Sequence, residues 1–221
     1  MRFELLVFDL DGTLIDSKLD LALSVNATRA NAGLDPIAHE EIYSYVGNGA
    51  PLLIRKSLGP EASEEQAEEG LLFFYQYYRE HMLDNTRLYP AVREGLDRLA
   101  AGGSRLAVLT NKPVRFSSEI IARLGLDGHF ERVYGGNSFE TKKPDPQGLN
   151  LLLEELNTPK ERTLMVGDSS VDVLTARNAK VTSCGVTYGL QPETFVEHPP
   201  DILVDHFDGV VAAVMEAPAL A

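Results

Sequence analysis

Cysteine is nearly absent from this sequence, and long hydrophobic runs are missing. Cys184 is the single cysteine of 221 residues, so no disulfide can form within the chain. No cluster of histidine and cysteine has the spacing of a zinc site, which favours a small buried thiol as the interpretation of Cys184. Redox chemistry at a thiol is therefore not expected.

The apolar stretches fall far short of the roughly 20 residues that a membrane-spanning helix needs. The N-terminal segment MRFELLVFDLD carries acidic residues inside its apolar run, unlike a secretory signal. The composition, 44% hydrophobic and 24% charged, is typical of an ordinary globular protein. We therefore expect a cytoplasmic protein without a membrane partner.

Positive charge is also scarce. The chain has 20 Lys and Arg residues against 33 Asp and Glu residues, which gives a net charge of −13. A surface of this sign repels nucleic acids and anionic membranes, so neither is expected as a partner. An anionic substrate would need a local reversal of the field, which a divalent cation and one or two lysines in a cleft could supply.

Six short runs are hydrophobic almost without a break: ELLVFDL, RLAVLTN, FERVYGG, TLMVGDS, TSCGVTYG and DILVDHF. Runs of this kind fit strands that are buried on both faces of a parallel sheet. Segments with helical periodicity lie between them, and two of these open at or beside a proline. The alternation from about Tyr89 onward predicts a doubly wound, Rossmann-like α/β fold with its site at the carboxyl ends of the strands.

One long segment interrupts this alternation because it contains no strand-like run. Between about Ser17 and Leu88 the sequence indicates four helices, at residues 17–32, 39–46, 50–58 and 63–83. The sequence therefore predicts an all-helical cap domain, residues 17–88, inserted after the first strand of an α/β core formed by residues 1–16 and 89–221.

The last of these helices carries an apolar and aromatic stripe at near-helical spacing. Its members are Leu71, Leu72, Phe74, Tyr75 and Tyr78. We interpret this stripe as a face that packs into a core, because such spacing is typical of an amphipathic helix, rather than as an aromatic binding site.

Polar residues of complementary type stand at the ends of predicted strands and in one loop. In chain order they are Asp9, Asp11 and Thr13, then Thr110 and Asn111, then Lys142 and Lys143 in TKKPDP, and finally Asp168 and Asp172 in MVGDSSVD. Each has an ordinary structural explanation by itself, such as an N-cap, a turn residue or a first-turn acid. Together, at one edge of a parallel sheet, they indicate a catalytic site.

This set of residues fits phosphoryl transfer through a covalent aspartyl phosphate. Asp9 would attack phosphorus, and it needs positive charge nearby because the carboxylate and the phosphate are both negative. Mg²⁺ held by Asp9 and Asp168, with a backbone carbonyl such as that of Asp11 and waters, would supply most of that charge. Asp11 would protonate the leaving alcohol and later deprotonate the attacking water.

Other residues of the set would hold the phosphoryl group. Lys143 would offset its charge. Thr110 and the backbone N–H groups near Asp11 and Asn111 would hydrogen-bond its oxygens. Chemistry alone does not decide which of Lys142 and Lys143 faces the phosphate, and Lys143 is favoured because it directly precedes PDP.

The segments DLDGTLIDS, LTN, KKPDP and GDSSVD resemble, in this order, the four motifs of the haloacid dehalogenase superfamily. The resemblance covers nearly the whole chain, and one class of the family carries a helical cap directly after the first motif. An aspartate at the second acid position favours phosphatase over dehalogenase chemistry. The resemblance implies Asp9 as nucleophile, Asp11 as acid and base, Thr110 and Lys143 as phosphate-binding groups, and Asp168 and Asp172 as acids that bind or orient Mg²⁺.

Within that class, YVGNGAPLLIRKSLG and LTNKP are similar to segments of bacterial phosphoglycolate phosphatases. Gly47, Asn48 and Gly49 would expose N–H groups at the start of a helix, which suits a small carboxylate, with Arg55 nearby as a charge partner. A glycine-rich turn with a solvated Arg55 is the alternative interpretation. Lys112 is a further candidate for contact with the substrate.

Rival functions stay open at this point. A phosphatase could act on another small phosphate, such as a sugar phosphate, pyrophosphate or a nucleotide. A phosphomutase of the same superfamily is less favoured because similar proteins carry a histidine on the first cap helix, and residues 17–32 contain none. A non-catalytic binding module is the least favoured, because no residue of the set is replaced. The expected partner is a small phosphorylated metabolite, and both a monomer and a homodimer fit.

Overall fold

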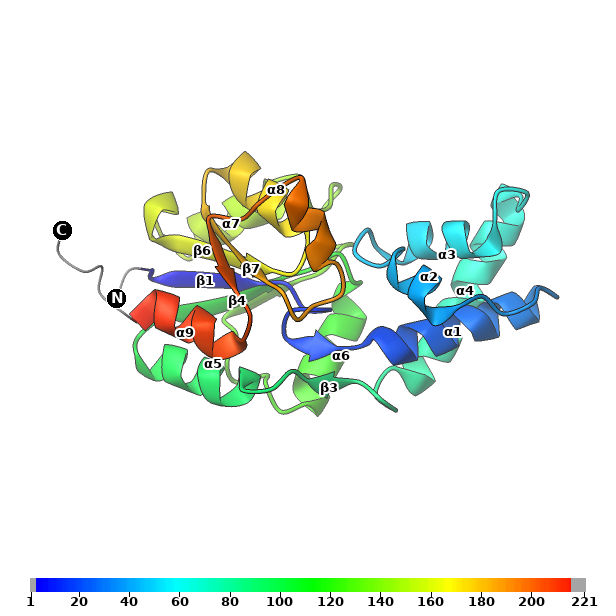
Figure 1. The fold of residues 1–221 in the computed structure, drawn as a ribbon, viewed down its shortest axis with the longest axis horizontal. Coiled ribbons are helices and arrows are strands. Elements are labelled where there is room, and N and C mark those ends of the chain that lie inside the picture. The colour runs from blue at the N-terminus through cyan, green and yellow to red at the C-terminus, as the bar shows by residue number, and fades with distance from the viewer. Residues whose placement is uncertain (1–2, 216–221) are drawn as a thin grey trace.

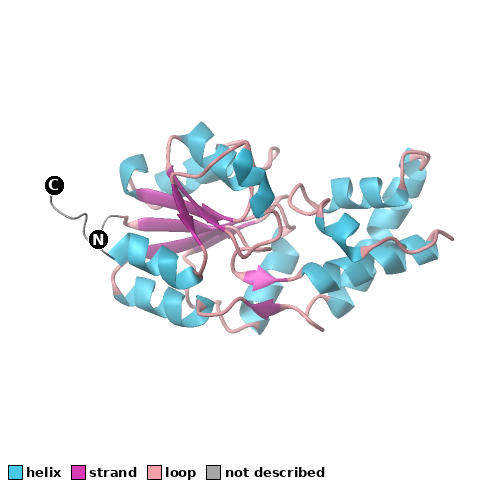
Figure 2. Ribbon diagram, in the orientation of Figure 1, coloured by secondary structure: helices cyan, strands magenta, loops and turns pink. Residues whose placement is uncertain are grey.

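A computed structural model describes residues 3–215 of the chain (Figure 1, Figure 2). Within these residues, six parallel strands form one sheet in the order β5-β4-β1-β6-β7-β8. Each predicted hydrophobic run contains one strand, so the predicted doubly wound α/β fold is confirmed. The strands are β1 (Leu5–Phe8), β4 (Arg105–Leu109), β5 (Arg132–Tyr134), β6 (Thr163–Gly167), β7 (Thr182–Val186) and β8 (Ile202–Val204).

Helices cover both faces of the sheet (Figure 2). The side chains of Leu6 and Phe8 pack toward α5, α6 and α9, whereas Leu5 and Val7 pack toward α7 and α8. All four are fully buried, and burial on both faces explains why the runs are unbroken. The helices are α5 (Val92–Ala101), α6 (Val114–Arg123), α7 (Gln147–Glu155), α8 (Ser170–Ala179) and α9 (Phe207–Met215).

The strand order reverses direction at β1. From β1 the chain continues to β4 and β5 on one side, and then returns to β6, β7 and β8 on the other side. In open α/β sheets, the crevice outside the carboxyl ends of the strands at such a switch point is the usual place for a ligand. The polar residues that follow β1 and β6 are therefore adjacent at this crevice.

Four helices lie together beyond the carboxyl edge of the sheet (Figure 1). These cap helices are α1 (Lys18–Asn31), α2 (His39–Tyr43), α3 (Ala50–Leu58) and α4 (Glu64–His81). All four were predicted, but α2 ends three residues before the predicted end because residues 44–46 form a turn. They fall inside the predicted cap of residues 17–88, whose exact boundaries stay a prediction, and residues 1, 2 and 216–221 of the predicted core lie outside the described part.

A short antiparallel ribbon corrects the sequence analysis, because one of its two strands lies within residues 17–88, where no strand was expected. It pairs β2 (Ile15–Asp16) with β3 (Arg87–Leu88), at the two points where the chain passes between the core and the cap helices. Strands of two residues leave no periodic pattern, so the sequence gives no signal for them. Helix α9 was not predicted either. Within residues 3–215 no helix combines the length and the hydrophobicity required to cross a bilayer.

Candidate active site

The end of β1 leads into a tight turn that places two carboxylates, those of Asp9 and Asp11. Gly12 follows with a φ of 83°, and a Cβ at this position would lie 2.1 Å from Oδ2 of Asp168. Glycine is required here because the backbone adopts a left-handed conformation and passes directly against the loop after β6. The sequence DxDG thus brings the ends of β1 and β6 together.

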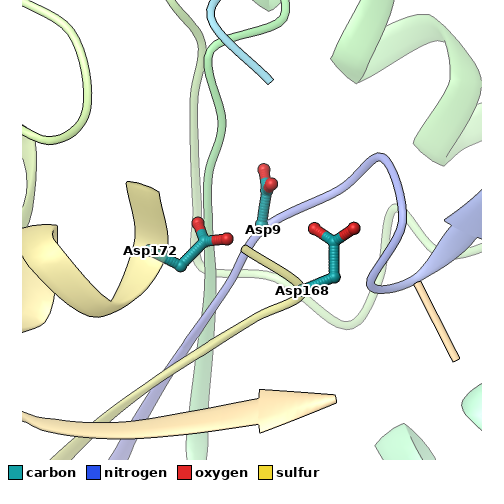
Figure 3. A group of neighbouring side chains, drawn as sticks. All are labelled: Asp9, Asp168 and Asp172. Atoms are coloured by element: carbon teal, nitrogen blue, oxygen red, sulfur yellow. The ribbon is translucent and has the colours of Figure 1, made fainter. Parts of the chain in front are cut away.

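Three carboxylates from different elements form an acidic trio (Figure 3). Asp9 follows β1, Asp168 follows β6, and Asp172 lies in the first turn of α8. One carboxylate oxygen from each lies within 4.8 Å of the others, and all three residues are buried. Figure 3 shows the three side chains converging on one space.

Burial makes the charge of this trio costly. Loss of solvation raises the pKa of Asp9 to about 6, although the nearby Lys143 opposes this shift. Burial and the charges of Asp172 and Asp9 also raise the pKa of Asp168 well above its usual range. Three convergent carboxylate oxygens with excess negative charge fit a hard divalent cation, which prefers oxygen ligands. The carboxylate of Asp11 is not part of this trio.

Lys143 is the buried cation beside the trio. Its Nζ lies 3.0 Å from Oδ1 of Asp9 and 2.6 Å from Oδ1 of Asp172, and only 2% of its side chain is exposed. Burial disfavours its charge, but the carboxylates of Asp172 and Asp9 raise its pKa above the usual value. Lys142 is exposed, so the structure places Lys143, and not Lys142, against the acidic groups.

Asp11 is held by a different pair of donors. Lys112 Nζ donates to both of its carboxylate oxygens at 3.0 Å, and Ser17 Oγ donates to Oδ1 at 2.5 Å. Lys112 is buried and lies over the ring of Tyr78, with Nζ 4.6 Å from the ring centroid. The two aspartates of DxD therefore have separate partners, Lys143 for Asp9 and Lys112 for Asp11.

The end of β4 supplies Thr110 and Asn111. The Asn111 amide donates to the carbonyls of Gly47 (2.9 Å) and Lys143 (3.0 Å), and its Oδ1 accepts from the Lys143 N–H (3.0 Å). The Asn111 side chain therefore links β4, the Lys143 loop and the loop before α3. Thr110 lines the pocket, and its Oγ1 accepts a hydrogen bond from the N–H of Lys112 (3.3 Å).

An open pocket of about 660 Å³ connects these groups to the cap helices. Asp9, Asp11 and Asp168 lie at its floor, and the apolar side chains of the cap helices line the opposite side. Gly47 and Gly49 also line it, with φ values of 105° and 87°. Gly49 is the residue before α3, so this helix begins at the pocket as predicted.

Two predicted cap residues are not brought into the pocket. Arg55 does not line it, because its side chain points to α4, where Nη1 lies 2.9 Å from a carboxylate oxygen of Glu64. Asn48 does not line it either. In this arrangement Arg55 is paired with Glu64 and is not in the pocket, so its contact with a substrate carboxylate stays a prediction.

Sequence analysis missed several residues that shape the site. Ser17 donates to Asp11, and Gln191 donates to the carbonyls of Tyr43 (3.3 Å) and Ser44 (3.1 Å) at the end of α2. The backbone N–H of Leu190 donates to Oδ2 of Asp168 (2.6 Å). No local pattern marks Gln191 or Leu190, because both reach the site through the loop after β7.

The comparisons with known proteins agree with this geometry. The model of the haloacid dehalogenase-like hydrolase family matches residues 6–186. This range is most of the chain and contains the acidic trio, both lysines and the cap helices. The chain belongs to the haloacid dehalogenase-like hydrolases.

Several relatives within this family are similar to the chain over nearly its whole length. The chain is 38% identical over 218 residues to the phosphoglycolate phosphatase of Colwellia psychrerythraea, covering 96% of each chain. It is also 38% identical over 215 residues to the phosphoglycolate phosphatase of Agrobacterium fabrum, covering 96% of this chain and 92% of the relative. A solved structure from Haemophilus somnus, described as a predicted phosphoglycolate phosphatase, superposes with a TM-score of 0.92 at 32% identity, covering 96% of this chain and 98% of that chain.

Proposed function

We propose that this phosphatase hydrolyses a small phosphomonoester through a phosphoryl group carried on Asp9, and that it depends on Mg²⁺. The observation that carries the proposal is the acidic trio with Lys143 against it, because a carboxylate can attack a phosphate only where positive charge surrounds both. Mg²⁺ bound by the trio would supply Lewis-acid stabilisation of the phosphate charge. A divalent metal is general among phosphatases of this family.

In the first step, an oxygen of Asp9 forms a bond to phosphorus while the bond from phosphorus to the leaving alcohol oxygen breaks. Asp11 gives its proton to that oxygen. In the second step, water transfers a proton to Asp11 and attacks phosphorus, and the bond to Asp9 breaks to release inorganic phosphate. Lys143 and Thr110 hold the phosphoryl oxygens, and Asp11 lines the same pocket as Asp9, as these steps require.

The substrate that we propose is 2-phosphoglycolate, which would give glycolate and phosphate. The names of the relatives support it, and the pocket that α3 lines has room for a small acid. Sugar phosphates, pyrophosphate and nucleotides are the alternatives, and a phosphomutase is less favoured because α1 carries no histidine. A cytoplasmic enzyme that acts as a monomer or a homodimer fits this proposal.

The experiment is a comparison of kcat/KM for 2-phosphoglycolate, sugar phosphates, pyrophosphate and nucleotides with Mg²⁺ and after its removal. A hundredfold preference for phosphoglycolate, about 2.7 kcal/mol of transition-state discrimination, would support the substrate. The Asp9→Asn variant is the control, with an expected loss on the order of 10⁴-fold. A flat profile would reject phosphoglycolate, and full activity without Mg²⁺ would reject the metal dependence.

A further inference from the structure

Tyr78 occupies an unusual position in the pocket. It lies on α4 with 1% of its surface exposed, and its ring stacks on Phe74 at 5.4 Å between centroids. Phe116 of α6 packs edge-on against the same ring at 5.5 Å. Contacts on both sides fix the orientation of the phenol, and Tyr78 is one of the residues that line the pocket.

The Tyr78 hydroxyl is fully buried and has no partner at hydrogen-bond distance and angle among the described residues, although the Lys112 ammonium lies close enough to act on its pKa. A buried hydroxyl without a partner costs stability that a phenylalanine at the same position would not. Burial raises the pKa of Tyr78 to about 12 against the opposing charge of Lys112, so the group is an O–H donor at neutral pH. Because this hydroxyl lowers the stability of the protein, we infer that it donates its hydrogen bond to a bound ligand.

The side chains of the cap that line the pocket around Tyr78 limit which ligands can bind there. Among the described cap residues that line the pocket, Tyr75 and Tyr78 are the only ones with polar side chains. The others offer backbone or apolar groups. They are Leu21, Val46, Gly47, Gly49, Ala50, Leu53 and Phe74. Any polar part of a leaving group that extends from Asp9 toward the cap helices therefore meets few side-chain donors.

Lys112 provides a second donor next to Tyr78. Its ammonium lies 4.6 Å from the Tyr78 ring centroid and donates to the two carboxylate oxygens of Asp11. Two of the three ammonium protons go to Asp11, and the ammonium also interacts with the ring and the hydroxyl of Tyr78, so Lys112 and Tyr78 lie together as a pair of donors. Arg55, the cation predicted for this role, does not line the pocket.

We propose that the Tyr78 hydroxyl and the Lys112 ammonium beside it bind a carboxylate on the leaving group of the substrate. A carboxylate offers two acceptor oxygens, which matches one neutral and one charged donor on adjacent side chains. The pair would select phosphomonoesters of small hydroxy acids over neutral ones of the same size. This inference rests on the proposed phosphatase function of the same site.

The test compares two substrates that differ only by the carboxylate, 2-phosphoglycolate and ethyl phosphate. We expect Tyr78→Phe to lower the ratio of their kcat/KM values about tenfold or more, mainly through a higher KM for phosphoglycolate. The inhibition constant of glycolate should rise by a similar factor. The matched control is Tyr77→Phe on the same helix, because the Tyr77 ring stacks on Phe73 and contacts His81 outside the pocket. This variant should keep the wild-type ratio.

The outcomes separate this inference from the function on which it rests. If the wild-type protein hydrolyses both substrates and Tyr78→Phe keeps the ratio within twofold, the inference is overturned and the phosphatase proposal stands. If the wild-type protein hydrolyses neither substrate, the proposed function fails, and the inference fails with it. A thermal midpoint of Tyr78→Phe at or above that of the wild type shows that the fold is intact, since the variant removes only an unpartnered hydroxyl. The wild-type preference for phosphoglycolate over ethyl phosphate tests the carboxylate contact without any variant, and no preference would overturn the inference.

Discussion

At the scale of single residues, the site is a balance of buried charges. The acidic trio faces one buried ammonium, that of Lys143, while Lys112 serves Asp11. Loss of solvation, and after it the negative charge of the neighbouring carboxylates, raises the pKa of both Asp9 and Asp168. A bound divalent cation would offset this negative charge, so metal binding and proton binding should compete at these carboxylates.

The raised pKa of Asp9 predicts how the stability of the metal-free protein depends on pH. The folded pKa of Asp9, about 6, lies above its usual value of 3.8, so its stabilising effect is complete below pH 4. The effect is lost as the pH rises through 6, which lowers the free energy of unfolding by about 3 kcal/mol. The measurement is chemical denaturation between pH 4 and pH 7, for the wild type and Asp9→Asn.

The variant should be less sensitive to pH over this range, because it cannot lose the proton. Saturating Mg²⁺ should reverse the trend in the wild type, since the metal binds the ionised form. Identical pH profiles for the wild type and Asp9→Asn without metal would contradict the account of the charge balance.

At the scale of elements, the site depends on how closely two strand ends approach. The turn after β1 and the loop after β6 meet at Gly12, where no space exists for a side chain next to Asp168. The turn after β1 therefore limits where the Asp168 carboxylate of the neighbouring loop can lie. The carboxylate of Asp168 is also fixed by the backbone N–H of Leu190 from the loop after β7.

We expect Gly12→Ala to disrupt metal binding more than folding. The added methyl group would displace the Asp168 carboxylate, so the dissociation constant for Mg²⁺ should rise at least tenfold, about 1.4 kcal/mol. Titration calorimetry with Mg²⁺ measures this. The matched control is Gly33→Ala, because Gly33 has a similar φ of 73° but no atom near the position of a Cβ. That variant should lose about 1 kcal/mol of stability without loss of Mg²⁺ affinity, and equal effects of both variants would contradict the expectation.

At the scale of the whole molecule, the ribbon of β2 and β3 connects the cap helices to the core. Core side chains also form hydrogen bonds with backbone carbonyls of the cap. Asn111 binds the carbonyl of Gly47, and Gln191 binds the carbonyls of Tyr43 and Ser44. We expect the cap helices to open for substrate entry by motion near residues 16–18 and 87–90, with these contacts breaking.

We expect Gln191→Ala to favour the open arrangement. Two hydrogen bonds are lost only in the closed form, which should shift the equilibrium toward the open form by about tenfold. Small-angle X-ray scattering should then report a larger radius of gyration, and KM should rise. Glu193→Ala is the control, because Glu193 lies in the short helix Pro192–Val196 that directly follows Gln191 and its side chain is exposed. Unchanged scattering in Gln191→Ala would show that this contact does not hold the cap helices closed.

Prediction from the sequence succeeded where a pattern recurs along the chain. The strands were predicted because their burial on both faces leaves unbroken apolar runs. Asp9 and Asp168 were singled out because each directly follows such a run, and Asp172 because it lies in the segment MVGDSSVD. Tyr78 was correctly placed in a packed stripe, but its ring also lines the pocket, which the spacing of residues does not reveal. Arg55 and Gln191 could not be assigned because their roles depend on which neighbouring helix or loop each side chain meets in three dimensions.

The central claim, a phosphoryl group carried on Asp9, is tested most directly by rapid acid quenching of the enzyme during turnover of phosphoglycolate, followed by peptide mass spectrometry. The account predicts one phosphoryl group on the peptide that contains Asp9, formed before the steady state and absent from Asp9→Asn. An active enzyme whose phosphoryl group maps to another residue, or that carries none throughout the pre-steady-state period, would contradict it.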